Sequence, residues 1–534
     1  SPIPNPQSPI PIKYVLIIYF YILNSQIYNF ILLKFYMSKN EEIDEKSGAI
    51  ASLIPDDKEE GDEINLSEEK KNEKVEEENK EEKDIDNEKE EDLELIDELN
   101  DDRNWFGRTC GKMRPGSLRG SIFSLSILSL GIGTLAIPQK VGVMGLIFSP
   151  IFIILSGLAN LWSLKVLGKI SMKFNLKKYE QVIKHLFGKK VSLFFGIIMI
   201  INQTGVIILY EVILYKILGG CINEIGGYGF INVEEFAEKS FWSNFWVRFL
   251  VLYGIAVFIL FPLCQLKDVS KMRYATTFGL FSLFILTLII VIECPFFIKE
   301  NIINKKHPVN YYDILPGLQG NMKFLQSIVT LFYAYSCHVG AFPVFASLHR
   351  PTKTRVAKLF NRAIAIDIVS YLITGAAGYL SQPLNAPDLV IERDKIFKSD
   401  WLMTFGNICF TFTLIAKVSV NYNALRSSIL VLLNYTTNEY PNSVNYIITS
   451  SVLILTTFVA VSFQSISDYI SLIGSFCTVI LSFFVPGIIY VKGNDYPVTH
   501  YKNILTLIFI SVILLLGMTS GFFTIKGIIE KKSN

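Results

Sequence analysis

Three ionisable side chains interrupt long apolar stretches, where a charge is costly unless it is paired or serves a function. They are Glu211 in QTGVIILYEVILYK, Lys417 in TLIAKVSVNYN and His338 in YSCHVGAFP. A buried carboxyl group can bind and release a proton, which makes Glu211 the candidate for proton coupling. On a helix, Gln203 and Tyr210 are expected to share one face with Glu211, because offsets of seven and eight residues complete two turns.

Each of these residues also has a structural alternative. The glutamate would instead lie near the outer end of its helix, paired with Lys216 or facing a water-filled vestibule. Lys417, with Asn421 one turn later, either serves a function at membrane depth or forms an interhelical ion pair, for instance with Asp367. The histidine is either a proton relay or a hydrogen-bonded structural residue.

Two of the apolar stretches contain helix-breaking residues near their middle. One reads SLSILSLGIGTLAIPQKVG and the other SIVTLFYAYSCHVGAFPVFASLHRP. Glycine permits unwinding, proline removes a backbone donor, and non-helical backbone at membrane depth requires protein or a wet cavity beside it. Free amides at such a break suit a carboxylate, and free carbonyls suit an ammonium group. Ordinary packing kinks are the alternative. The predicted amino acid site comprises Gly131, Ile132, Gly133, Thr134, Tyr333, Ser336 and Cys337.

The composition indicates a polytopic membrane protein. Of 534 residues, 51% are hydrophobic, 13% aromatic and 18% charged, which is too few charges for a typical soluble protein. A bilayer crossing takes about 20 apolar residues, and eleven such spans predict an all-α fold of eleven transmembrane helices. The spans are expected at 118–138, 143–168, 191–219, 245–265, 274–298, 322–347, 359–382, 402–433, 444–463, 466–490 and 503–525.

The formal net charge of +2 averages two unlike parts of the chain. Residues 41–102 hold 29 acidic and 8 basic residues, whereas residues 103–534 carry a net charge of +20. If the spans alternate, the connections on the side of Arg103 contain 22 Lys and Arg residues and those on the other side 11. Because positive connections favour the cytosol, the N-terminus is expected there and the C-terminus across the membrane.

Three parts are predicted along the chain. Residues 1–36 resemble translated non-coding DNA ahead of Met37 and are interpreted as a gene-model extension rather than a twelfth helix. Residues 37–102 are rich in Glu, Lys, Asn and Asp, so this acidic tail is expected to be disordered. Residues 103–534 are expected to form the transmembrane transporter domain.

No motif indicates covalent chemistry. HExxH, GxSxG and P-loop patterns are absent, and the seven cysteines show neither a CxxC pair nor a metal-ligand spacing. We therefore expect no enzyme activity, no cofactor, no metal and no nucleic acid partner. The expected partners are the lipid bilayer, an amino acid substrate and, for coupling, protons.

Three motifs resemble the amino acid/auxin permease family: GSLRGSIFSLSILSLGIGTLAIPQKVG, CHVGAFPVFASLHRPTKTR and VNYNALRSSIL. The resemblance covers residues 115–525 and is greatest to members from malaria parasites and other apicomplexans, including one of the digestive vacuole. It implies a LeuT-like fold of two inverted five-helix repeats plus one helix. It also implies a vacuolar or lysosome-like membrane, with the plasma membrane as the alternative. In sodium transporters of this fold the first and eighth helices hold sodium, so Lys417 there implies sodium-independent transport.

Together these features predict a secondary active transporter of neutral or aromatic amino acids that works by proton symport or antiport. The alternative is a membrane receptor that senses amino acids with the same pocket and signals through the acidic tail. A channel would show polar stripes along several helices, whereas this sequence shows helix breaks and isolated charges.

Overall fold

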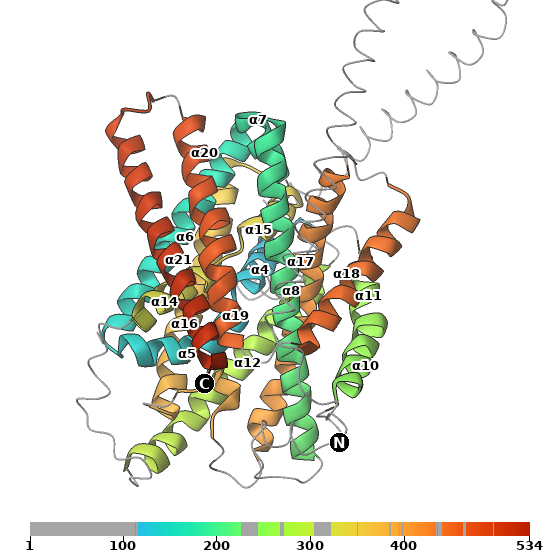
Figure 1. Cartoon of the computed structure of the whole chain (residues 1–534), viewed down its shortest axis with the longest axis vertical. Helices are drawn as coiled ribbons and strands as arrows, with labels where there is room; N and C mark the ends of the chain where they lie inside the picture. The colour runs from blue at the N-terminus through green and yellow to red at the C-terminus, as the bar shows by residue number, and fades with distance from the viewer. Residues whose placement is uncertain are drawn as a thin grey trace, which may run out of the picture. The chain divides into compact units, whose positions relative to one another are not determined.

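The computed structural model describes residues 113, 116–225, 244–266, 272–303, 322–349, 351–383, 386–394, 396, 400–433, 435, 440–462, 466–494 and 496–533. Residues Met113–Asn534 form one compact unit, and all regular structure in the described part of it is helical (Figure 1). The predicted extension at 1–36 and the predicted tail at 37–102 lie outside the described residues, as does the start of the predicted domain at 103–534.

Ten helices in the described ranges are long and apolar enough to cross a membrane, and a bent pair of helices forms an eleventh span. Each overlaps one predicted span, so their number and order are confirmed. In chain order the helices are α4 (Leu118–Ser129), α5 (Ile132–Met144), α6 (Phe148–Lys173), α7 (Tyr179–Phe187), α8 (Lys189–Ile225), α10 (Phe245–Ile255), η2 (Ala256–Leu260), α11 (Phe261–Cys264), α12 (Arg273–Ile298), η4 (Lys299–Ile303), α14 (Met322–Ala334), α15 (His338–Ala346), α16 (Lys353–Ser381), η5 (Val390–Glu392), α17 (Trp401–Leu432), α18 (Asn442–Ser462), α19 (Ile466–Ile473), η6 (Gly474–Thr478), η7 (Ile480–Phe484), α20 (Val485–Gly493) and α21 (Tyr501–Ser533).

The first span is broken between α4 and α5, which are bent by 49°. Gly131 at the break has φ 155° and ψ −111°, a conformation that residues with a side chain rarely adopt, and a Cβ there would collide with the Lys417 side chain. Gly133 permits a second close approach, because a Cβ there would lie 2.7 Å from the Ala334 Cβ. Local geometry therefore requires glycine at both predicted positions.

The sixth span is broken between α14 and α15, where Tyr335, Ser336 and Cys337 lie outside both helices. The Ser336 N–H turns back to the Tyr333 carbonyl (2.9 Å), and the Ala341 N–H donates to the Cys337 carbonyl (2.7 Å) as the next helix begins. Both predicted breaks are confirmed. Each opens a group of five spans, and α21 follows the second group.

The bundle exposes apolar side chains and buries charged ones, as expected for a protein surrounded by lipid. Phe258 is 81% exposed and Leu505 66%, whereas Asp367 and Lys417 are at most 1% exposed. In the packing, α16 contacts α4 and α5, α12 contacts α4, and α17 contacts α4 and α15. These helices therefore surround the two breaks.

The connections lie at two opposite ends of the bundle (Figure 1). The end at α7, here called the α7 face, includes residues 116–117, 174–188 and 496–500. The opposite end, here called the η5 face, includes residues 299–303 and 386–394. On the α7 face, the His349 N–H donates to the Gly116 carbonyl (3.0 Å) and the Arg273 side chain to the Met113 carbonyl (3.1 Å). Three parts of the chain that the alternation of spans places on the side of Arg103 are therefore in contact: the segment before α4 contacts both the start of α12 and the segment after α15.

Candidate functional site

The carbonyl ends of the two broken helices converge on α16. The Tyr371 hydroxyl lies 2.9 Å from the Ser129 carbonyl oxygen and 2.7 Å from the Ala334 carbonyl oxygen, so one side chain joins both breaks. One turn earlier, Asp367 accepts a hydrogen bond from the Ser129 hydroxyl. The last carbonyls of a helix have no partner within that helix. The Tyr371 hydroxyl therefore satisfies open carbonyls at both breaks, whereas Asp367 contacts the Ser129 side chain.

Lys417 of α17 contacts the carbonyl that follows Ser129 at the first break, which is that of Leu130. Its ammonium group donates to the Leu130 carbonyl and lies 5.1 Å from the centre of the Tyr210 ring. A cation is favourable at the carbonyl end of a helix such as α4. Lys417 interacts electrostatically with Asp367, but in the described bundle no ion pair within 4.0 Å joins them. The direct ion pair considered from the sequence is therefore replaced by a contact with the break itself.

The amide ends of α5 and α15 border one small cavity. Ile132 and Gly133 line it from the first turn of α5, and His338, Val339 and Gly340 line it from the first turn of α15. The first N–H groups of a helix have no partner within the helix and attract anions. The cavity volume is about 20 Å³, room for about one water molecule. The helices must therefore move apart before a solute the size of an amino acid enters.

Most of the predicted site residues line this cavity. Those that do are Ile132, Gly133, Tyr333, Ser336, Cys337, Lys417, Asn421 and His338. Gly131 carries the bend instead, and the buried Thr134 hydroxyl has no hydrogen-bond partner among the described residues. Binding of a substrate by these residues stays a prediction.

Glu211 lies behind the cavity wall. Its carboxylate accepts a hydrogen bond from the Thr456 hydroxyl of α18 (3.0 Å), whereas Gln203 and Tyr210 line the cavity. The predicted common face is wrong because consecutive residues are turned by about 100° around a helix, so Tyr210 and Glu211 point in different directions. The alternative pairing with Lys216 is wrong as well, since that lysine pairs with a glutamate of η5 (2.6 Å).

Amide side chains of α8 and α17 form a polar wall of the cavity. Gln203 Nε2 donates to Asn421 Oδ1 (3.3 Å), and Asn202 Nδ2 donates to Gln203 Oε1 (3.2 Å). Asn202 and Tyr371 are absent from the predicted site. For both, the available signal was a polar group inside an apolar span, but the partner lies on a distant segment.

His338 has the structural contact considered from the sequence, and it also borders the cavity. Its Nε2 contacts the Ser163 hydroxyl of α6, which is a structural contact. Its Nδ1 is buried without a hydrogen-bond partner in the described structure, and the residue lines the cavity, so proton relay stays a prediction. Among the described residues, no three His, Cys, Asp or Glu side chains are grouped as metal ligands.

A larger hollow, here called the vestibule, lies on the α7 face. Its volume is about 360 Å³, and residues of α7, α15 and α17 line it. Tyr179 of α7 stacks on Phe342 of α15 with ring centroids 5.0 Å apart, and Ser428 of α17 donates to the buried Glu180 carboxylate. Val339 lines both the vestibule and the central cavity. The first turn of α15 therefore borders both spaces.

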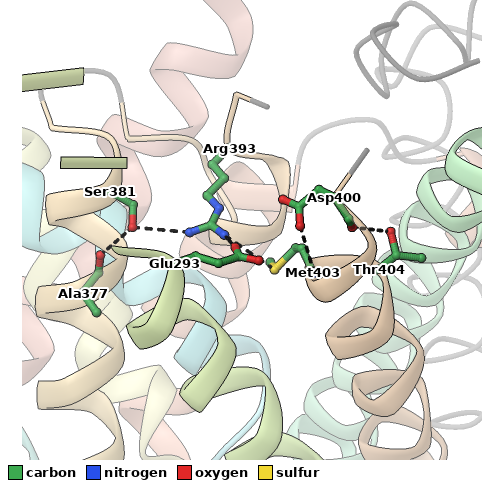
Figure 2. A network of polar contacts seen from close by, with 7 residues as sticks. All are labelled: Glu293, Ala377, Ser381, Arg393, Asp400, Met403 and Thr404. Carbon is green, nitrogen blue, oxygen red and sulfur yellow. Dashed lines mark hydrogen bonds and ion pairs between the residues drawn. The ribbon is translucent and has the colours of Figure 1, made fainter. Parts of the chain in front are cut away.

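The η5 face is held by charged contacts (Figure 2). Arg393, which follows η5, forms a buried ion pair with Glu293 of α12 and donates to the Ser381 hydroxyl of α16 (3.3 Å). Burial lowers the pKa of the Arg393 guanidinium to about 10, while Asp400 opposes that shift. At neutral pH the guanidinium therefore keeps its charge, and the connection stays tied to two spans.

A sequence profile described as transmembrane amino acid transporter protein matches residues 114–530. Amino acid transporter AVT6E of Arabidopsis thaliana is 24% identical over 49% of this chain, and the match spans only about half (51%) of that relative. Putative amino acid transporter AAT1 of Plasmodium berghei (strain Anka) is 23% identical over 80% of the chain and 73% of the relative. Vacuolar amino acid transporter 5 of Schizosaccharomyces pombe is 22% identical over 69% of the chain and 83% of the relative.

Among solved structures, the crystal structure of MhsT in complex with L-phenylalanine matches with a TM-score of 0.53 at 13% identity. The match covers 77% of this chain and 100% of that chain. MhsT has the LeuT fold, so the predicted all-α, LeuT-like fold is confirmed. None of these proteins is described as a receptor, and the alternative of an amino acid sensor has no support.

Proposed function

We propose, since the chain belongs to the transmembrane amino acid transporter family, that it is a secondary active transporter of amino acids. The family predicted from the motifs is thereby confirmed, and it is a family of transporters rather than enzymes. The observation that carries the proposal is the meeting of two broken spans at one buried cavity. An amino acid has a carboxylate for the amide ends and an ammonium group for the carbonyl ends.

We further propose coupling to protons rather than to sodium. Lys417 supports sodium independence, because its ammonium group donates to the Leu130 carbonyl at the first break. Glu211 remains the proposed proton carrier, since it is fully buried and one of its carboxylate oxygens has no hydrogen-bond partner in the described bundle. From its place behind the cavity wall, it would act on the packing of α8 against α18 rather than on the substrate directly.

For orientation we propose a cytosolic N-terminus, which makes the α7 face cytosolic. The two-to-one excess of Lys and Arg in the connections of that side supports this choice. The name of the vacuolar relative supports a vacuolar membrane, whose lumen would meet the η5 face. Neutral or aromatic substrates are supported by a lining that includes Tyr210, Tyr333 and uncharged amides.

Reconstitution of the full-length chain into proteoliposomes tests these proposals. Labelled neutral amino acids should accumulate when a pH gradient is imposed and sodium is absent. Uptake that requires sodium would contradict the assignment of Lys417, and an unchanged response of Glu211→Gln to the gradient would contradict that of Glu211. Failure of folded protein to move any amino acid would contradict the transport proposal itself.

A further inference from the structure

A chain of three side-chain amides crosses the wall of the cavity and ends in an unpaired oxygen. Asn421 Nδ2 donates to the Lys417 carbonyl (2.9 Å), Gln203 Nε2 to Asn421 Oδ1 (3.3 Å), and Asn202 Nδ2 to Gln203 Oε1 (3.2 Å). The last acceptor in this series, Asn202 Oδ1, accepts no hydrogen bond from the described residues. The three side chains are only 5%, 3% and 6% exposed for Asn202, Gln203 and Asn421, respectively.

A buried acceptor without a partner is costly, and native proteins rarely keep one without a reason. All three amides line the central cavity, so a solute in the cavity is the group placed to complete the chain. The free oxygen of Asn202 needs an N–H or O–H donor. A carboxamide or hydroxyl side chain supplies that donor, whereas an aliphatic side chain or a phenyl ring does not.

The charged groups of the cavity lining further restrict which substrate side chains fit. Lys417 lines the cavity, whereas the Asp367 and Glu211 carboxylates contact Ser129 and Thr456 and are not part of its lining. A cationic side chain would face the Lys417 ammonium group without an anion in the lining. An anionic side chain would meet the acceptor oxygen of Asn202, and the Lys417 ammonium group that would offset its charge already donates to the Leu130 carbonyl. Charges buried without partners are strongly unfavourable, so an uncharged side chain fits best.

We propose that the amides of Asn202, Gln203 and Asn421 make the site selective for neutral amino acids with a carboxamide or hydroxyl side chain over those with aliphatic or aromatic hydrocarbon side chains. This inference rests on the proposed transport function and narrows the proposed neutral or aromatic substrates to those whose side chain forms hydrogen bonds, which sets phenylalanine aside. A site that hydrogen-bonds its ligand rejects an analogue without that group, because the buried partner is left unpaired. The expected discrimination between glutamine and leucine is on the order of ten- to a hundredfold.

The test compares uptake of labelled glutamine, serine, leucine and phenylalanine by the full-length chain in proteoliposomes. The wild type should show a glutamine-to-leucine ratio of kcat/KM of about ten or more. In Asn202→Leu this ratio should fall about tenfold or more, because the unpaired oxygen is gone and the wall is apolar. The matched control is Asn160→Leu, which removes a fully buried amide of α6 that donates to the Ser156 carbonyl and is absent from the cavity lining. Its ratio should equal that of the wild type.

Two outcomes would overturn the inference. One is wild-type uptake of leucine or phenylalanine as efficient as that of glutamine, which would leave the transport proposal intact. The other is an equal loss of all substrates in folded Asn202→Leu while the control stays active, which would give the amides a structural role alone. If Asn202→Leu fails to fold, uptake of the four amino acids by the wild type still tests the proposed selectivity.

Thermal unfolding of the purified chain with each amino acid separates this inference from the transport proposal, because a ligand stabilises the state that it binds. A higher Tm with glutamine than with leucine, without uptake of either, would support the selectivity and overturn transport. Uptake with equal Tm shifts for glutamine and leucine would support transport and overturn the selectivity.

Discussion

The two faces of the bundle differ in how they use charged side chains. On the η5 face, the charge of Arg393 after η5 is paired with Glu293 inside α12. On the α7 face, Arg426 of α17 donates to the backbone carbonyl of Cys264 (2.8 Å), and a vestibule of about 360 Å³ lies beside it. On the η5 face, side-chain ion pairs thus join a connection to the spans. The α7 face instead contains the vestibule.

Under the proposed transport function, this difference indicates a conformation that opens toward the α7 face. A transporter that alternates its access must separate contacts on one face while it closes the other. Here the η5 face is held together and the vestibule approaches the central cavity from the α7 face. We therefore expect the contacts of Arg393 to set the balance between the two conformations.

The largest expected effect comes from breaking the buried ion pair on the η5 face. Arg393→Met leaves Glu293 buried without its partner, and loss of one member of such a pair costs about 3–5 kcal/mol. The variant should unfold at a lower temperature and favour the conformation open to the η5 face. Thermal unfolding and labelling of a cysteine introduced at that face measure the two effects.

The matched control is the double variant Arg393→Met with Glu293→Met, which removes both charges. It should recover most of the lost stability, because apolar residues often replace a buried ion pair at little cost. A double variant as unstable as the single one would show that packing, rather than charge, holds the η5 face.

A second, smaller effect is expected at the break of the first span, where Lys417 contacts the Leu130 carbonyl. Lys417→Met removes a charged hydrogen bond to the Leu130 carbonyl, worth about 1.5–3 kcal/mol. Uptake should fall about tenfold or more as α4 loses its fixed place beside α17. Lys165→Met, which changes an exposed lysine of α6, is the control and should transport normally. Undiminished uptake by Lys417→Met would show that the break is held without the ammonium group.

The sequence predicted what depends on local signals. Apolar length located the eleven spans, and glycine with proline located both breaks. The face of Glu211 was assigned wrongly because a helix offset of eight residues was taken as equivalent to seven, although neighbouring residues diverge around a helix. Tyr371 and the amide chain depend on contacts between segments 242 and 218 residues apart, respectively. Such pairings follow from tertiary packing, which residue periodicity does not contain.

A third effect, of about 1 kcal/mol, is expected where one side chain joins both breaks. Tyr371→Phe removes the hydroxyl that lies within hydrogen-bond distance of the Ser129 and Ala334 carbonyls. The stability loss should be accompanied by a higher KM, because the two carbonyl ends are no longer held together. Tyr422→Phe, which removes a buried hydroxyl contact with Thr449 of α18 (2.7 Å), should lose similar stability and keep its KM. Equal KM changes in both variants would contradict a special role for Tyr371.

The smallest effect is expected for the second ion pair of the η5 face. Lys216 and Glu392 lie 2.6 Å apart, but their side chains are 21% and 22% exposed, so water and salt weaken their attraction. Lys216→Gln should lower stability by less than about 1 kcal/mol, and added salt should remove most of the difference from the wild type. Thermal unfolding at low and high ionic strength measures both.

The comparison of Lys216→Gln with Arg393→Met decides what closes the η5 face. Both variants delete one cation of an ion pair between the η5 connection and a span, and they differ in burial. If desolvation controls closure, the buried pair dominates and its effect is insensitive to salt, because screening acts mainly on exposed charges. Equal losses that disappear together in high salt would instead show that the η5 face is held by the sum of its surface charges.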